Sequence, residues 1–261
     1  MHRVIVPVDF SETSLNAARY TAQMLAGKED ALAILYTFYD GPDDLDVCIN
    51  FQESLKREFR KAGVREVECI RETGGDLIDH ISRLAHTLRA TLIVMGITGK
   101  SAIRAALFGS NTLRLIDRNL YPVMIIPPDA GYKGLRNVLF ATDLKEVETC
   151  TPSALINSVL ELFNPTLHLV HVTRDTMTRL PEPLAAEKNK LEALFSRFTT
   201  EFHLLHQTDF FKAMDEFIAA KDIDVIITIP KHQSNATSIF KSTHTKRLAY
   251  HSQIPILAAH E

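Results

Sequence analysis

The chain has 261 residues, of which 46% are hydrophobic and 23% are charged, and its formal net charge is −3. This composition suits one large or two small globular domains, and the charge balance gives no strong basic field for nucleic acid or an anionic membrane. No apolar run approaches the ~20 residues that span a bilayer. The first residues lack the layout of a signal peptide, and three scattered cysteines argue against a disulfide framework. We therefore expect a cytoplasmic protein with no nucleic-acid and no membrane partner.

In the first half of the chain, apolar β-rich runs alternate with helical patterns. The runs fall at about residues 3–8, 31–37, 66–71, 91–96 and 122–126. One helix is expected to follow Ser11 as its N-cap and to end at Gly27, and another to begin at Asp76. This strand–helix–strand rhythm predicts an α/β fold, a parallel doubly wound sheet with helices on both faces. Ligands bind such sheets at the carboxyl ends of the strands, where the strand order reverses.

The second half of the chain repeats the first. Asp9 is matched by Asp143 and Asp76 by Asp209, and the closing run that starts at Pro122 is matched by one that starts at Pro255. These anchors occur in one order and at nearly constant spacing, which indicates an internal repeat. We predict two homologous domains, residues 1–130 and 135–261, which are joined by a Pro/Gly-rich segment.

A spaced glycine series follows the fourth predicted strand. It contains Gly96, Gly99 and Gly109, and Ser110 and Asn111 then open a helix. Glycines can adopt positive φ and let the backbone approach a ligand, and a helix N-terminus binds phosphate readily. Lys100 could neutralise phosphate charge. The series is neither a Walker A motif nor the dinucleotide-binding fingerprint, and the alternative interpretation is that the glycines only close turns.

With this series, Val6-Pro7-Val8-Asp9 and Tyr121-Pro122-Val123-Met124 make the whole chain resemble the universal stress protein family in its tandem two-domain form. The resemblance implies that each half is a five-stranded parallel, Rossmann-like sheet of the adenine nucleotide alpha hydrolase-like type. It implies binding of ATP, with ADP and AMP left open and Mg²⁺ accompanying the phosphates. It also implies that the closing strands of the two halves pair as a pseudo-dimer; a homodimer of the whole chain is left open.

The resemblance assigns roles to individual residues. Asp9 would meet the adenine base, although by itself an aspartate here is also typical of a helix cap or a solvated loop charge. The pocket wall would be formed by Pro7, Val8 and Thr37, and the ribose and phosphates would be held by Gly96, Gly99, Gly109, Ser110 and Asn111.

The matched positions of the second half have lost the glycines. Gly96 becomes Ile229, Gly99 becomes His232, and Gly109-Ser110 becomes Ser242-Thr243. A β-branched residue does not readily adopt positive φ, so we expect one nucleotide per chain, bound in the first half. A different small ligand near Asp143 is left open.

These observations favour a stress-response regulatory module that acts on an unidentified protein partner. The alternatives are a ligand-free interaction scaffold and an adenylating or ATP-hydrolysing enzyme of the same fold group. No catalytic residue can be placed, so ATP hydrolysis should be slow at most. Cys48 is expected in an acidic loop over residues 40–48, where thiolate formation is disfavoured, and is interpreted as non-catalytic.

Eight of the 11 histidines lie in the second half. The pairs His168/His171 and His203/His206 fall on expected strands, where an odd spacing directs the two rings to opposite faces. A zinc site needs further ligands besides two histidines. We therefore expect surface or packing histidines and no metal site.

Overall fold

The computed structural model describes residues 1–39, 41, 44–97, 110–118, 121–173, 179–229 and 254–259. The elements of the first half are β1 (His2–Pro7), α1 (Glu12–Leu25), β2 (Ala31–Tyr39), α2 (Leu45–Ala62), β3 (Glu66–Thr73), α3 (Leu77–Leu88), β4 (Leu92–Gly96), α4 (Ser110–Arg118) and β5 (Val123–Ile126). Those of the second half are β6 (Asn137–Ala141), α5 (Val147–Cys150), α6 (Ser153–Leu160), β7 (Thr166–Thr173), α7 (Glu182–Leu194), β8 (Thr199–His206), α8 (Phe210–Lys221), β9 (Val225–Thr228) and β10 (Ile256–Ala258).

The predicted helix starts of the first half are confirmed. The hydroxyl of Ser11 accepts a hydrogen bond from the amide of Ser14 at the start of α1. Asp76 caps α3 by accepting from the amides of Ile78 and Asp79. Each cap satisfies amide groups that have no partner inside the helix.

The predicted position of Cys48 is wrong, because α2 already begins at Leu45 and Cys48 lies on its buried face. Burial, followed by the nearby Asp44 carboxylate, raises the pKa of the Cys48 thiol, and the charge of Arg71 opposes this only in part. The thiol is therefore protonated at neutral pH, so the interpretation as non-catalytic agrees with its environment.

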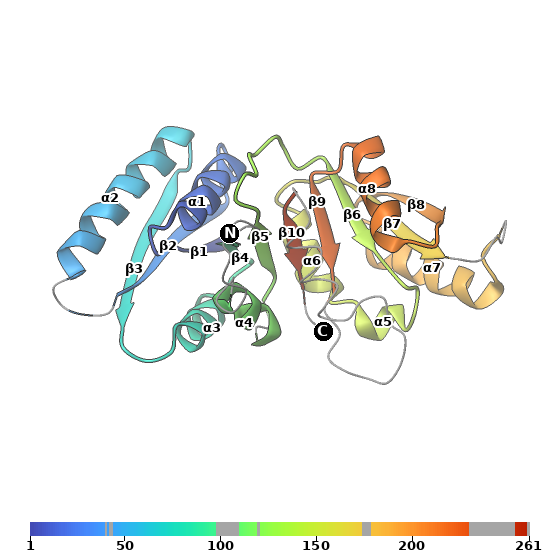
Figure 1. Ribbon diagram of the computed structural model, residues 1–261, viewed down its shortest axis with the longest axis horizontal. Helices are drawn as coiled ribbons and strands as arrows, with labels where there is room; N and C mark the ends of the chain where they lie inside the picture. The colour runs from blue at the N-terminus through green and yellow to red at the C-terminus, as the bar shows by residue number, and fades with distance from the viewer. Residues whose placement is uncertain are drawn as a thin grey trace.

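All ten strands form one sheet, in the order β3-β2-β1-β4-β5-β10-β9-β6-β7-β8. Neighbouring strands are parallel within each half, and β5 and β10 pair antiparallel in the middle of the sheet, with Met124 opposite Leu257. Figure 1 shows these two strands side by side between the halves. The closing strand of each half therefore has a partner on both sides and leaves no free edge there.

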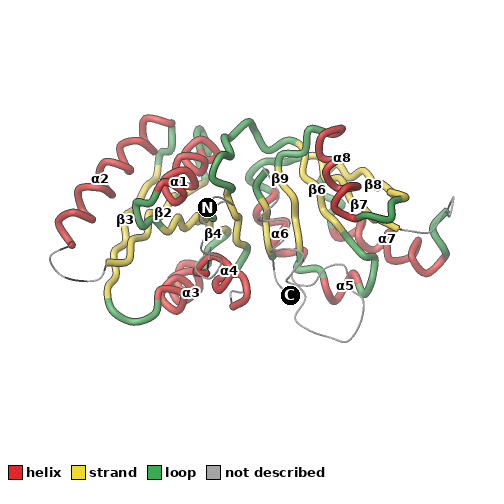
Figure 2. Tube along the Cα trace, viewed as in Figure 1, coloured by secondary structure: helices red, strands yellow, loops and turns green. Residues whose placement is uncertain are grey.

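Helices cover both faces of the sheet (Figure 2). One buried apolar cluster joins the strands to α1, α2, α6 and α7, and the other joins them to α3, α4 and α8. Each cluster contains residues of both halves, so the core is continuous across the β5–β10 pair. Among the described residues, no helix has the length and apolar character to cross a membrane.

Candidate functional site

Of the predicted site residues, Pro7, Val8, Asp9, Thr37 and Gly96 lie at or near the carboxyl ends of three neighbouring strands. β1 lies between β2 and β4, and the chain passes from β1 outward to β2 and β3 before it returns to β4 on the other side. Strand order therefore reverses between β1 and β4, which is where ligands bind in parallel α/β sheets. The amide of Val8 donates to the carbonyl of Tyr36 at 2.8 Å, so the residue after β1 lies beside the end of β2, near Thr37.

Asp9 is held in a tight turn directly after β1. Its Oδ1 atom accepts hydrogen bonds from the amide of Ser11 at 3.0 Å and from the Ser11 hydroxyl at 2.6 Å. Partial burial alone would raise the pKa of the Asp9 carboxyl, but the hydrogen bonds from Ser11 and Ser14 outweigh it and hold the pKa below its ordinary value. Asp9 therefore presents an ionised carboxylate on the exposed side of the strand ends.

The backbone conformation of this turn recurs in the second half. Phe10, which follows Asp9, has φ 61°, and Leu144, which follows Asp143, has φ 51°. Positive φ is uncommon for such side chains and marks a turn that its surroundings stabilise. In both turns the carboxylate accepts from the amide two residues later, which is that of Ser11 or Lys145. The aspartate turn is therefore a shared feature of both halves.

The residues that are expected to wall a pocket beside Asp9 are buried. Pro7 and Val8 are buried, and Thr37 is 2% exposed. The buried side-chain amide of Gln52, on α2, donates to Thr37 Oγ1 at 3.0 Å and to the carbonyl of Leu35 at 3.0 Å. Sequence reasoning named Thr37 but missed Gln52. The sequence feature that could have identified Gln52 is a glutamine among apolar residues at helical spacing. A polar side chain that is buried in this way must find hydrogen-bond partners.

Gly96 ends β4 directly against the first turn of α1. A Cβ built on Gly96 would lie 2.3 Å from the carbonyl oxygen of Thr13, which leaves no room for any side chain. The expectation that Gly96 adopts positive φ is wrong, because Gly96 is absent from the residues with that conformation. Gly96 lets β4 and α1 approach each other closely. The same contact fixes the backbone of Gly96 at the point where the strand order reverses.

Helix α4 begins at Ser110, as the glycine series predicts. The buried Thr112 donates its hydroxyl to the carbonyl of Gly96 at 3.0 Å, so the first turn of α4 lies beside the end of β4. Arg114 donates to Asp76 at 2.6 Å and holds the pKa of that carboxyl below its ordinary value, which fixes α4 against α3. Asn111 is exposed in this first turn. Gly99, Lys100 and Gly109 lie outside the described residues.

The second half differs at the matched position. The counterpart of α1 is divided into α5 and α6, with Thr151 and Pro152 between them. Ile229, which replaces Gly96, lines a small open pocket with a volume of about 20 Å³. The pocket is also lined by Phe140, Ala141, Thr142, Asp143, Lys145, Val147, Cys150 and Thr151. His232, Ser242 and Thr243 lie outside the described residues.

The histidines of β7 and β8 are arranged in a way that spacing along one strand did not predict. His171 faces the carbonyl of Thr142, whereas His168 faces His203 on the neighbouring strand. The expectation of opposite faces considered each strand alone, and it missed the contact that the pairing of two strands creates.

The chain is similar to known proteins in both sequence and structure. A sequence model of the universal stress protein family matches residues 1–127. Among solved structures, a universal stress protein from Archaeoglobus fulgidus DSM 4304 is 17% identical with a TM-score of 0.71, and the match covers 99% of this chain and 96% of that chain. A putative universal stress protein from Pseudomonas aeruginosa UCBPP-PA14 is 14% identical with a TM-score of 0.67, covering 100% and 93%.

A third solved structure, the cytoplasmic domain of a prokaryotic cation chloride cotransporter, is 9% identical with a TM-score of 0.59, covering 98% of this chain and 94% of that chain. No curated protein sequence matches the chain. At these identities the solved structures establish the fold of the whole chain, and a shared fold does not fix a function.

Proposed function

The chain belongs to the universal stress protein family through residues 1–127, and we propose that it is a regulatory module that binds one adenine nucleotide in its first half. ATP occupancy would favour one state of a surface that binds a protein partner in the stress response. Such a switch requires ATP to bind the two states with different affinity.

The observation that carries this proposal is the meeting of three strand ends with the start of α4 at the strand-order reversal. The first turn of α4 is tied to the end of β4 by the Thr112–Gly96 hydrogen bond. Amide groups of a helix N-terminus attract phosphate, and the glycine series leads into this helix. The ionised Asp9 carboxylate stands at the end of β1 and can accept hydrogen bonds from an adenine amino group.

A single site per chain is proposed because the halves differ where the backbone would approach the phosphates. In the glycine series, Gly99 and Gly109 of the first half are replaced by His232 and Ser242 at the matched positions of the second half. The aspartate turn is present in both halves, so the carboxylate alone does not distinguish them. We propose that the nucleotide is ATP and that Mg²⁺ accompanies its phosphates.

Titration calorimetry with ATP and Mg²⁺ tests the proposal. We expect saturable binding of about one nucleotide per chain, and loss of this binding in Gly109→Val, because the larger side chain would block the approach of the phosphates. The matched control is Ser242→Val, the same change at the equivalent position of the second half, which should bind ATP like the unmodified protein.

The other outcomes identify the alternatives. Absence of ATP binding by the folded, unmodified protein would favour a ligand-free interaction scaffold. Rapid ATP turnover with an acceptor acid would favour an adenylating enzyme. Loss of binding in Ser242→Val with retention in Gly109→Val would assign the nucleotide to the second half and contradict the proposal.

A further inference from the structure

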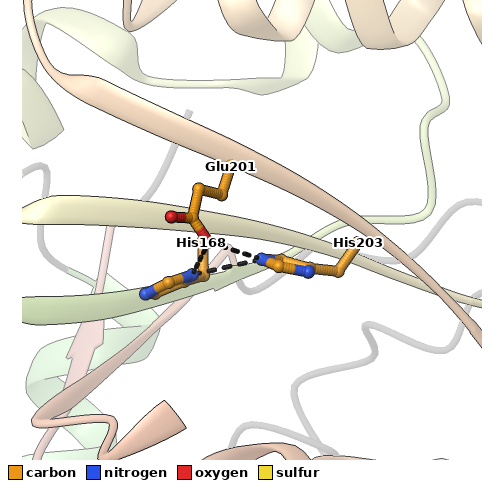
Figure 3. Close-up of side chains that lie close together, drawn as sticks. All are labelled: His168, Glu201 and His203. Carbon is orange, nitrogen blue, oxygen red and sulfur yellow. Dashed lines mark hydrogen bonds and ion pairs between the residues drawn. The ribbon is translucent and has the colours of Figure 1, made fainter.

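Three potential metal ligands converge on the two outer strands of the second half (Figure 3). His168 of β7 lies opposite Glu201 of β8 in the strand register, and Val170 lies opposite His203. Side chains alternate between the faces of a strand, so His168, Glu201 and His203 point to the same side of the sheet.

The separations between the ligand atoms are short and nearly equal. Nδ1 of His168 lies 3.1 Å from Nε2 of His203. Oε2 of Glu201 lies 3.4 Å from the first nitrogen and 3.5 Å from the second. A tetrahedral zinc ion with bonds of about 2.0–2.1 Å holds its ligand atoms about 3.3 Å apart. The three atoms therefore already have the spacing of three corners of a zinc coordination tetrahedron.

We propose that His168 Nδ1, His203 Nε2 and Glu201 Oε2 bind a divalent transition-metal ion of the zinc class. Two imidazoles and one carboxylate are a ligand set that such ions accept, and three protein ligands leave one coordination position for water. The site lies on β7 and β8, in the half of the chain that does not carry the proposed nucleotide site. The inference is therefore independent of nucleotide binding.

A cation satisfies this cluster better than hydrogen bonds do. One proton shared between the facing imidazole nitrogens makes a single hydrogen bond, and the third atom is a carboxylate oxygen that only accepts. A cation at the centre would contact all three atoms together. A neutral imidazole offers a metal ion the lone pair of its unprotonated nitrogen.

The tautomer of His168 decides which of its nitrogens can bind the ion. Its Nδ1 lone pair is available when the ring proton is on Nε2. That atom is buried without a hydrogen-bond partner among the described residues, so the proton has no acceptor there and does not orient the ring. Packing does so instead, since the rings of His168 and His203 both contact Phe217 of α8, with centroids 5.9 Å and 4.8 Å away.

The cluster is open to solvent on one side. The side chain of His168 is 4% exposed, that of His203 is 20% exposed and that of Glu201 is 46% exposed, so an ion can enter past the carboxylate. Lys221 of α8 places its Nζ 3.3 Å from Glu201 Oε2. This ammonium group is a competing cation for the same oxygen, and its removal should favour the metal ion.

Zinc titration of the full chain, prepared without a polyhistidine tag, tests the site by competition with a chromophoric chelator. Four histidines lie outside the described residues and can bind zinc elsewhere, so the readout is the difference between variants. We expect His203→Gln and Glu201→Gln each to lose one zinc equivalent, or to bind it at least roughly tenfold more weakly, since loss of even an outer partner weakens metal binding about 10–100-fold.

The matched control is His206→Gln. This exposed histidine lies three residues further along β8, on the opposite face, and its replacement should leave the zinc equivalent intact. Lys221→Gln should bind zinc more tightly than the unmodified protein. With Co²⁺ in place of zinc, the intense visible absorption of four-coordinate cobalt should appear in the unmodified protein and be absent in His203→Gln.

Any of three results would overturn the proposal. One is equal zinc binding by the unmodified protein, His203→Gln and Glu201→Gln, with circular dichroism showing that all are folded. Another is absence of zinc binding by the unmodified protein. The third is an affinity in Lys221→Gln that is unchanged or weaker, which would contradict an ion beside Glu201.

Discussion

The charge of Asp9 depends on one neighbouring hydroxyl more than on any other group. Ser11 both caps α1 and donates to Asp9 Oδ1, so the helix start and the carboxylate are built from the same side chain. In the second half, Asp143 Oδ1 accepts the corresponding backbone hydrogen bond, which the amide of Lys145 donates. The position of Ser11 is occupied by Lys145 in the second half, which places no hydroxyl there.

Ser11→Ala should raise the pKa of the Asp9 carboxyl, because it removes the 2.6 Å hydrogen bond that favours the ionised form. It should also lower the free energy of unfolding by about 1 kcal/mol through loss of the helix cap. Carboxyl chemical shifts followed through an acid titration by NMR measure the pKa, and urea denaturation at neutral pH measures the stability.

The dependence of stability on pH gives a second readout for this variant. The folded-state pKa of Asp9 is depressed, so its contribution to stability is present above the unfolded-state pKa and is lost as the pH falls through the folded-state value. Ser11→Ala should therefore lose less stability on acidification than the unmodified protein. Ser11→Thr retains the hydroxyl and should behave like serine. A pKa of Asp9 that does not change in Ser11→Ala would contradict the assignment.

At the scale of elements, the contact between α1 and β4 depends on the absence of a side chain at Gly96. Gly96→Ala should lower the free energy of unfolding by about 1–3 kcal/mol, because the added methyl group meets the backbone of Thr13 and the helix must shift. Urea denaturation measures this. Gly131→Ala is the control, since a Cβ there meets nothing within 4 Å. Equal stability of Gly96→Ala and the unmodified protein would show that α1 lies farther from β4.

The elements of the first half could be predicted from sequence because their signals are local. The apolar run near residues 91–96 became β4 at Leu92–Gly96, and Ser11 and Asp76 cap the helices that follow them. Contacts between elements carry no such local signal. The reason for a glycine at position 96 depends on how α1 packs, and the meeting of His168 with His203 depends on the register of β7 against β8. Neither follows from spacing within one segment.

At the scale of the whole molecule, the two halves are joined through β5 and β10. Leu257 lies opposite Met124 in this pair, and both side chains are 1% exposed in a cluster that contains residues of both halves. A destabilising substitution on β10 should therefore also lower the stability of the first half. This would make the chain one cooperative unit in unfolding, although its two halves have the same strand order.

Leu257→Ala should destabilise both halves together, by about 2–5 kcal/mol, because it opens a cavity in the shared cluster. The chain has no tryptophan, and five of its six tyrosines lie within the first 132 residues, so tyrosine fluorescence reports mainly on the first half. Circular dichroism reports on the whole chain. In Leu257→Ala, the urea midpoints of the fluorescence and circular dichroism transitions should both fall by the same amount. Leu257→Met conserves side-chain volume and should change these midpoints little. If the tyrosine transition stayed in place while the circular dichroism transition split in two, the halves would unfold independently and the β5–β10 pair would not couple them.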